Sequence, residues 1–144
     1  MFMLRAIALS LLVLSQTAQP AQPTADAAKK ALEQIQGTWQ VVTFNGQTAP
    51  QGVDVHLTFT ADKYEQWANG TADERGSFKV NPATKPASID LMIAEGSDAG
   101  KLQLGVYEIT GDTLSLTFAA PSDPVRPKTL ADGVVVVTLK KGKT

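Results

Sequence analysis

From residue 37 onward, apolar and polar side chains alternate with a period of two in eight short runs. This period places successive side chains on opposite faces of a strand, so each run predicts a half-buried β-strand. Turn-forming pairs such as Asn45-Gly46 and Gly111-Asp112 separate the runs, as is typical of hairpins. The predicted strands are residues 38–44, 54–60, 63–68, 76–80, 88–93, 102–110, 113–119 and 134–140.

Strands joined mainly by hairpin-length connections form an antiparallel meander. An open meander leaves two edges whose backbone groups can pair with other chains, and closure into a barrel removes both edges. The chain has 144 residues, enough for one domain with its own core. We therefore predict an all-β domain over residues 26–144, built as an eight-stranded antiparallel up-and-down barrel.

The two-residue turns predict which side chains share a face. If Gly111-Asp112 is a two-residue loop, Tyr107 faces Leu116, and Gly105 faces Phe118, whose ring can cover the bare glycine backbone. The same rule applied to the Ala61-Asp62 turn predicts three further pairs. They are Phe59 with Tyr64, Leu57 with Gln66 and, on the outer face, His56 with Trp67.

Side chains of inward parity are the candidates for a ligand-binding site inside the barrel. They are Leu57, Phe59, Tyr64, Gln66, Phe78, Leu91, Tyr107, Leu116 and Phe118. Apolar walls would surround a small apolar molecule, and the tyrosine hydroxyls and the Gln66 amide would orient it. Small barrels can instead pack solid with their own side chains. A ligand cavity and a filled core therefore both remain open at this point.

The first residues have the composition of an export signal. One positive charge, Arg5, precedes the mainly apolar run 6–14, and small or polar residues follow. This run is about half as long as a membrane-spanning helix requires. We predict a signal peptide over residues 1–18 and a proline-containing linker over residues 19–25. The mature protein is expected to be periplasmic or secreted, without a membrane anchor.

Residues 26–36 have the spacing of a short amphipathic helix. Ala28, Ala31, Leu32 and Ile35 fall on one side of it, so we expect the helix to close one end of the barrel. The run 134–137 consists of valines and is apolar on both faces of its strand. We therefore expect an outer cover over this strand, supplied by the same helix.

The segment Gly37-Thr38-Trp39 stands where this helix passes into the first strand. Glycine permits the backbone twist there, and the indole of Trp39 can plug the floor of the barrel. The segment resembles the G-x-W element of lipocalins, whose eight-stranded barrels can hold one small ligand. Many lipocalins carry an arginine late in the last strand that packs over this tryptophan. Lys140 and Lys141 stand nearest that place here.

A closer resemblance covers nearly the whole predicted domain. The segments QGTWQVV, LTF-x-x-DKY, G-x-F-x-V-x-P-x-x-x-P-x-x-IDL, EG-x-x-x-GK and G-V-Y-E-I-x-GDTL-x-L-x-F occur in this order. Together they resemble the lipocalin-like domain family found largely in exported proteins of Planctomycetes. The resemblance implies a lipocalin-like barrel and export, and it implies nothing catalytic.

Composition excludes several kinds of site. The chain has no cysteine, so disulfides, thiolate metal sites and thiol nucleophiles are excluded. Its formal net charge of −1 supplies no field that would gather nucleic acid. Asp73 with Glu74, and Glu95 with Asp98, occupy two separate predicted loops without the alternating carboxylates of a strong calcium site. We expect solvated turns there, with no metal and no cofactor.

No set of residues in the sequence predicts catalysis. His56 is the only histidine, and we expect it outside the barrel without a nucleophile or an orienting group. Glu65, Asp90 and Glu108 all have outward parity. No two carboxylates are therefore expected to converge inside the barrel, and we do not expect an enzyme.

Two functions follow from these patterns. The first is an exported binding module that takes a small apolar ligand into its barrel. The alternative is an exported interaction or structural domain with a filled barrel and no small ligand. Its candidate surfaces are the pair of His56 and Trp67 and the loop 121–133, which carries three prolines. The identity of a protein partner does not follow from the sequence.

Overall fold

The computed structural model describes residues 22–142, which contain one helix and nine strands. The predicted signal peptide, residues 1–18, and most of the predicted linker, residues 19–25, lie outside the described residues. The elements are α1 (Ala25–Ile35), β1 (Gly37–Phe44), β2 (Gln47–Thr48), β3 (Val55–Thr60), β4 (Lys63–Ala68), β5 (Thr71–Asn81), β6 (Ala87–Glu95), β7 (Leu102–Thr110), β8 (Thr113–Phe118) and β9 (Val135–Lys141).

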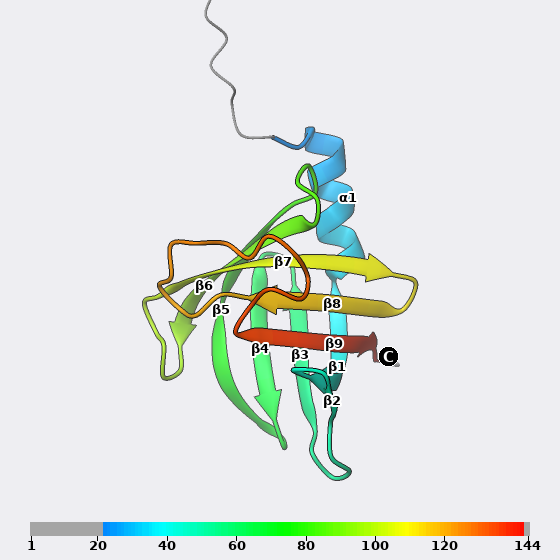
Figure 1. Cartoon of the computed structure of the whole chain (residues 1–144), viewed down its shortest axis with the longest axis vertical. Helices are drawn as coiled ribbons and strands as arrows, with labels where there is room; N and C mark the ends of the chain where they lie inside the picture. Colours follow the sequence, from blue (N-terminus) through cyan, green and yellow to red (C-terminus); the bar gives the residue numbers. More distant parts are fainter. Residues whose placement is uncertain (1–21, 143–144) are drawn as a thin grey trace, which may run out of the picture.

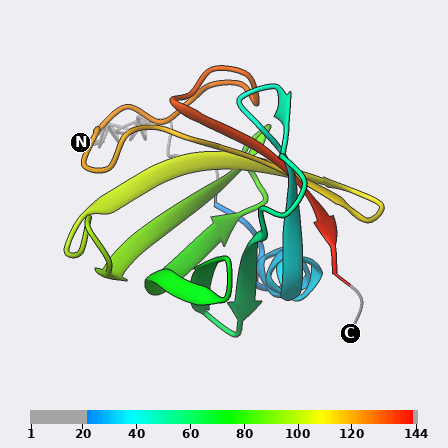
Figure 2. The same ribbon diagram turned by 90° about the horizontal axis from the view of Figure 1, so that it is seen from below.

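Eight of these strands close into an antiparallel barrel. β1 pairs with β3, each later strand pairs with the next, and β9 returns to pair with β1 (Figure 1). Figure 2 views the same barrel from below. The two-residue β2 is an addition that the period of two did not predict, and it pairs with the end of β1. The prediction of a closed eight-stranded antiparallel barrel with one short helix is confirmed.

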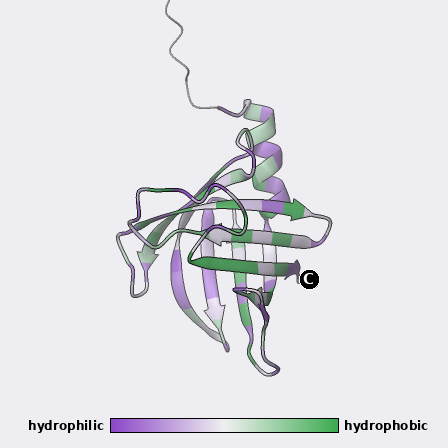
Figure 3. Ribbon diagram, viewed as in Figure 1, coloured by the Kyte–Doolittle hydropathy of each residue, from purple (hydrophilic) through white to green (hydrophobic). Residues whose placement is uncertain are grey.

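The turns and the hydrophobic alternation set the register that the sequence predicts. Tyr107 pairs with Leu116, and Gly105 pairs with Phe118. All three predicted pairs across β3 and β4 are also present. A Cβ atom on Gly105 would lie 2.4 Å from Cδ1 of Phe118, so the ring covers the glycine backbone closely. Figure 3 shows the alternation of hydrophobic and hydrophilic residues along the strands.

One predicted strand is too short. β5 begins at Thr71 rather than at residue 76. Asn69 and Gly70, with φ of 50° and 84°, form a tight turn, so pairing resumes at once with Thr71 opposite Ala68. A β-bulge early in β5 then breaks the alternation of side chains, which hides the start of the strand from the sequence pattern. The other predicted strand ends lie within two residues of the observed ends.

α1 lies at one end of the barrel (Figure 1). The side chain of Thr24 caps its N-terminus, and Ala31 and Ile35 on its inner side are buried. After its last turn, the side-chain amide of Gln36 donates to the carbonyl of Ala61 at 2.9 Å and accepts from the amide of Ala61 at 2.7 Å. These two bonds fix the end of α1 to the turn between β3 and β4.

Trp39 plugs the floor of the barrel beside α1. Its side chain is buried, and its indole Nε1 donates a hydrogen bond of 2.8 Å to the carbonyl of Ile35. Lys141 Nζ lies 5.0 Å from the centre of the Trp39 ring, within the range of a cation–π contact. The same ammonium donates to the carbonyl of Gln36 at 2.8 Å. Of the two lysines nearest this place in the sequence, Lys141 is therefore the one that packs over the tryptophan.

The prediction that α1 covers the outer side of the run 134–137 is wrong. α1 packs over the end of the barrel, where the buried side chain of Ile35 joins the hydrophobic core of the barrel. The loop after β8 instead covers the outer face of the neighbouring strand at Thr117, whose buried hydroxyl donates to the carbonyl of Leu130, and Val134 remains 59% exposed. In the same loop, the guanidinium of Arg126 lies 2.6 Å from the carboxylate of Asp90. The predicted loop 121–133 is therefore packed against the barrel wall.

Candidate functional site

The barrel is filled at the end near α1. Phe59 and Phe78 meet edge to face with ring centres 4.9 Å apart. Around them lie further buried side chains, which are Ile35, Trp39, Ile89, Tyr107, Leu114, Leu116 and Leu139. This half of the barrel is a packed hydrophobic core.

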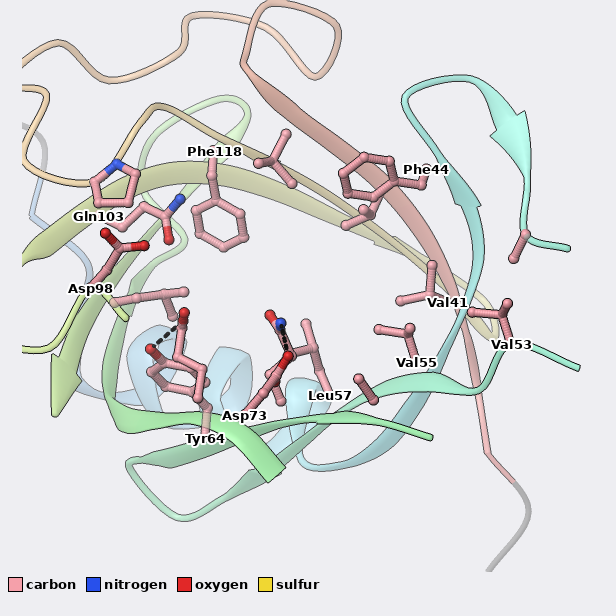
Figure 4. A pocket seen from close by; sticks show the side chains of 18 of the residues that line it. Val41, Phe44, Val53, Val55, Leu57, Tyr64, Asp73, Asp98, Gln103 and Phe118 are labelled. Carbon is pink, nitrogen blue, oxygen red and sulfur yellow. Dashed lines mark hydrogen bonds between the residues drawn. The ribbon is translucent and has the colours of Figure 1, made fainter. Parts of the chain in front are cut away.

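The other half of the barrel contains a cavity of about 610 Å³ (Figure 4). Its inner part is lined by buried side chains, among them Leu57, Tyr64 and Phe118. Its outer part reaches the segment between β1 and β3, where Phe44 is 51% exposed and Val53 is 42% exposed. The cavity therefore runs from a buried floor to an exposed apolar mouth. One half of the barrel is therefore packed and the other half is hollow.

The predicted interior residues divide between these two halves. Five of them line the cavity, namely Leu57, Tyr64, Gln66, Leu91 and Phe118. The other four, Phe59, Phe78, Tyr107 and Leu116, belong to the core cluster and do not line the cavity. Among the five cavity residues, all but Gln66 belong to that cluster as well. Tyr107 also borders a separate depression on the outer surface beside α1. Gly37 and Trp39 begin the first strand at the packed end, away from the cavity.

Several cavity residues lie outside the predicted set. Four of them are apolar wall residues that lie on strands, namely Val41, Val55, Val135 and Val137. The mouth residues Ala49, Pro50 and Val53 belong to loops, and Phe44 lies at the end of β1. A loop residue has no strand parity, so the alternation rule gives no information about its direction.

Polar side chains occupy one side of the cavity. The hydroxyl of Tyr64 donates a hydrogen bond of 2.9 Å to the carboxylate of Glu74. The amide of Gln66 donates to the carboxylate of Asp73 at 3.4 Å. Asp98, from the turn between β6 and β7, lines the same cavity. Figure 4 shows Tyr64, Asp73 and Asp98 on this side of the cavity, with the Val41 and Val53 wall opposite.

A β-bulge allows the neighbouring residues Asp73 and Glu74 to line the same cavity. Gln66 pairs with Glu74 and the next residue, Trp67, pairs with Ala72, so Asp73 is the extra residue of the bulge. Neighbours in a regular strand point to opposite faces, whereas a bulge redirects a side chain. The bulge therefore gives one side of the cavity two carboxylates from adjacent positions.

The expectation that no two carboxylates converge inside the barrel is wrong. Glu65 and Asp90 do face outward, where they pair with Arg75 and Arg126. Two signals could have located the convergence. The tight turn at 69–70 places Asp73 opposite Gln66, while the parity of Phe78 places Glu74 inward. Both predictions can hold only if the strand contains a β-bulge at these positions, because neighbouring residues of a regular strand point to opposite faces.

Burial and like charges shift the acid–base equilibrium of Glu74. Its half-buried position is the main cause that raises the pKa of the carboxyl above its ordinary value. The nearby charges of Asp73 and Asp98 raise this pKa further, and the hydrogen bond from Tyr64 opposes the rise. Burial, followed by the hydrogen bond to Glu74, also raises the pKa of the Tyr64 hydroxyl.

The predicted outer-face pair is present. The rings of His56 and Trp67 are stacked with centres 5.9 Å apart and planes 7° apart. Nδ1 of His56 lies 3.3 Å from the carboxylate of Asp54. A hydrogen bond from Gln40, followed by the one from His56, lowers the pKa of Asp54. These groups face away from the cavity.

Within residues 22–142, no group of His, Cys, Asp and Glu side chains is arranged so that it could hold a metal ion. No helix in the same range is long and apolar enough to cross a membrane. In comparisons with protein-family models, curated proteins and solved structures, none matched this chain.

Proposed function

We propose that this chain is an exported lipocalin-like protein, without enzymatic activity, whose barrel carries a small and mainly apolar molecule. The half-filled barrel is the observation that supports this proposal best. A packed floor lies below a cavity of about 610 Å³, and small-molecule sites commonly have volumes of about 300–1,000 Å³. An empty space in a core costs stability. A barrel that acted only through its outer surface would gain nothing from this cavity.

Export and family membership belong to the same proposal. The order of basic, apolar and small segments in residues 1–18 supports export. The ordered motifs of the domain support membership of the lipocalin-like family of exported Planctomycetes proteins. The closed barrel, with Trp39 at its floor, is compatible with that membership.

One observation favours an acid–base enzyme instead, and it is the convergence of Asp73, Glu74 and Asp98 on one cavity. Such an enzyme needs one group as acid and another as base on either side of the reacting bond. Here Glu74 accepts a hydrogen bond from Tyr64, and Asp98 lies 3.0 Å from Lys101. Two of the three carboxylates are therefore already engaged by partners within the protein, Glu74 by Tyr64 and Asp98 by Lys101. For this reason we place binding before catalysis.

Native mass spectrometry of the protein recovered from its own exported compartment tests the proposal. We expect a stoichiometric mass excess that disappears when the protein is denatured. Val55 lines the cavity from β3, so Val55→Trp should abolish the excess by filling the space. Thr58 lies on the same strand with the opposite parity, so Thr58→Trp is the matched control and should keep the excess.

A bare polypeptide mass in the native protein, together with no uptake of an uncharged naphthylamine fluorescent probe, would contradict the binding function. The search would then move to the outer surface. Equal loss of the mass excess in Val55→Trp and Thr58→Trp would show that the variants fail for reasons other than cavity filling.

A further inference from the structure

The carboxylates of the cavity lie on the side opposite Val41 and Val53 (Figure 4). Glu74 is half-buried and Asp73 is exposed, and both line the space that continues inward to Leu57 and Phe118. A molecule with its apolar part against Leu57 and Phe118 would therefore place its other end beside these two acids (Figure 4).

The charges around the cavity are unbalanced. The described lining residues include three acids, Asp73, Glu74 and Asp98, and no lysine, arginine or histidine. Asp98 has a cationic partner at 3.0 Å, Lys101. Asp73 and Glu74 instead receive hydrogen bonds from uncharged groups.

The nearest cation along the chain does not compensate Asp73 and Glu74. The guanidinium of Arg75, the residue after Glu74, pairs with Glu65 at 3.4 Å and with Glu95 at 3.2 Å. Both of these acids lie outside the set that lines the cavity. The positive charge of Arg75 is therefore used outside the cavity, and Lys79, the other cation of β5, does not line the cavity either.

Building on the proposed function, we infer that the carried molecule is a cationic amphiphile, with an apolar body inside the barrel and a basic nitrogen against Asp73 and Glu74. A carboxylate next to an apolar cavity is costly without a partner of opposite charge. An ammonium group supplies that partner through charge-assisted hydrogen bonds. The same acids repel the head group of a fatty acid, so they discriminate between molecules of similar shape.

The raised pKa of Glu74 is consistent with this arrangement. Burial, with the charges of Asp73 and Asp98, favours the neutral carboxyl, and Tyr64 favours the ionised form. A cation beside Glu74 would favour the ionised form further and lower this pKa. Binding of a cationic ligand should therefore weaken as the pH falls through the raised pKa and Glu74 becomes neutral.

Three probes of equal chain length separate charge from apolar binding. Decylamine, decanol and decanoate are each titrated against the protein at pH about 7, below their micelle concentrations, while they displace the uncharged naphthylamine fluorescent probe. We expect decylamine to bind about tenfold or more tightly than decanol, and decanoate to bind most weakly.

Two variants test the residues. Glu74→Gln keeps the acceptor for Tyr64 but removes the charge, and we expect it to lower decylamine affinity about tenfold while decanol affinity is retained. Glu65→Gln, on the outer face of the same hairpin, is the matched control and should change neither. Asp73→Lys reverses the charge at an exposed position and should raise the affinity for decanoate relative to decylamine.

The outcomes distinguish the two proposals. Binding of all three probes with equal affinity, or a preference for decanoate, would overturn the cationic ligand and leave the binding function intact. Unchanged decylamine affinity in Glu74→Gln and Asp73→Lys would also overturn it. If neither the naphthylamine probe nor any of the three chains binds, the proposed function fails, and the charge inference fails with it.

Discussion

The hydroxyl of Tyr64 lies 2.9 Å from the carboxylate of Glu74, to which it donates a hydrogen bond, at the level where the packed core gives way to the cavity. Tyr64 is only 1% exposed, so the ring belongs to the core while its hydroxyl reaches the cavity. Glu74 comes from the neighbouring strand, next to the bulge at Asp73. This pair joins the hydrophobic core to the charged side of the cavity.

Replacing Tyr64 with phenylalanine should destabilise the protein at neutral pH. The half-buried Glu74 loses its donor, and a buried group left without its hydrogen bond costs about 1–3 kcal/mol. Urea denaturation followed by circular dichroism measures the change. A double-mutant cycle with Glu74→Ala, which removes the acceptor, isolates the pair, and a coupling energy near zero would show that the hydrogen bond contributes nothing.

The raised pKa of Glu74 predicts a pH dependence of stability with a definite sign. Above its ordinary pKa of 4.5, the folded state holds the Glu74 proton more tightly than the unfolded state does. Folding is therefore favoured by protonation, and this contribution falls as pH rises from 4.5 through the raised pKa. The free energy of unfolding, relative to Glu74→Gln, should decrease over that window. A relative stability that rises with pH there would contradict the assignment.

Substituting Gly105 with alanine should cost more than an ordinary surface change. The new Cβ would lie 2.4 Å from Cδ1 of Phe118 and 2.7 Å from the carbonyl oxygen of Thr117, and overpacking of this kind typically costs about 1–3 kcal/mol. Thermal and urea unfolding measure the loss. Adding Phe118→Leu should restore part of the stability, because it removes the ring but leaves the carbonyl contact.

Lys141 should contribute to stability through Trp39. Removing its ammonium in Lys141→Ala eliminates a cation–π contact and the hydrogen bond to Gln36, with an expected loss of about 0.5–1 kcal/mol at this exposed site. Lys140→Ala, at the neighbouring position, is the control. Lys141→Arg should retain the stability, since a guanidinium also stacks on an aromatic face. Equal effects of the two alanine variants in urea unfolding would assign the loss to general charge effects.

Local pattern was sufficient for most of the barrel. Turn chemistry at Gly111-Asp112 and the alternation of apolar residues specify one register, because a slip by one residue would expose the large residues of one of the two strands, either Tyr107 or Leu116, to water. The same rule pairs His56 with Trp67 on the outer face, where the two rings are stacked. These features depend on the geometry of a few neighbouring residues, so they can be predicted from the sequence alone.

The site could be predicted only in part. Leu57, Tyr64, Gln66, Leu91 and Phe118 follow from inward parity, and all of them line the cavity. Parity cannot tell them from Phe59 and Phe78, which point inward as well but pack into the core. The difference depends on the depth of each residue along the barrel and on the side chains opposite, which come from distant strands.

The sequence by itself determined the strands, most of their pairing and the inward face of the barrel, because a period of two and the conformational preferences of turn residues act over a few neighbours. Only the tertiary structure decided that α1 closes the barrel end rather than covering β9. It also decided that half the barrel stays hollow and that Asp98 lines the same cavity as Asp73 and Glu74. Each of these outcomes depends on the closure of the sheet and on one bulge, which bring together residues that are distant in sequence.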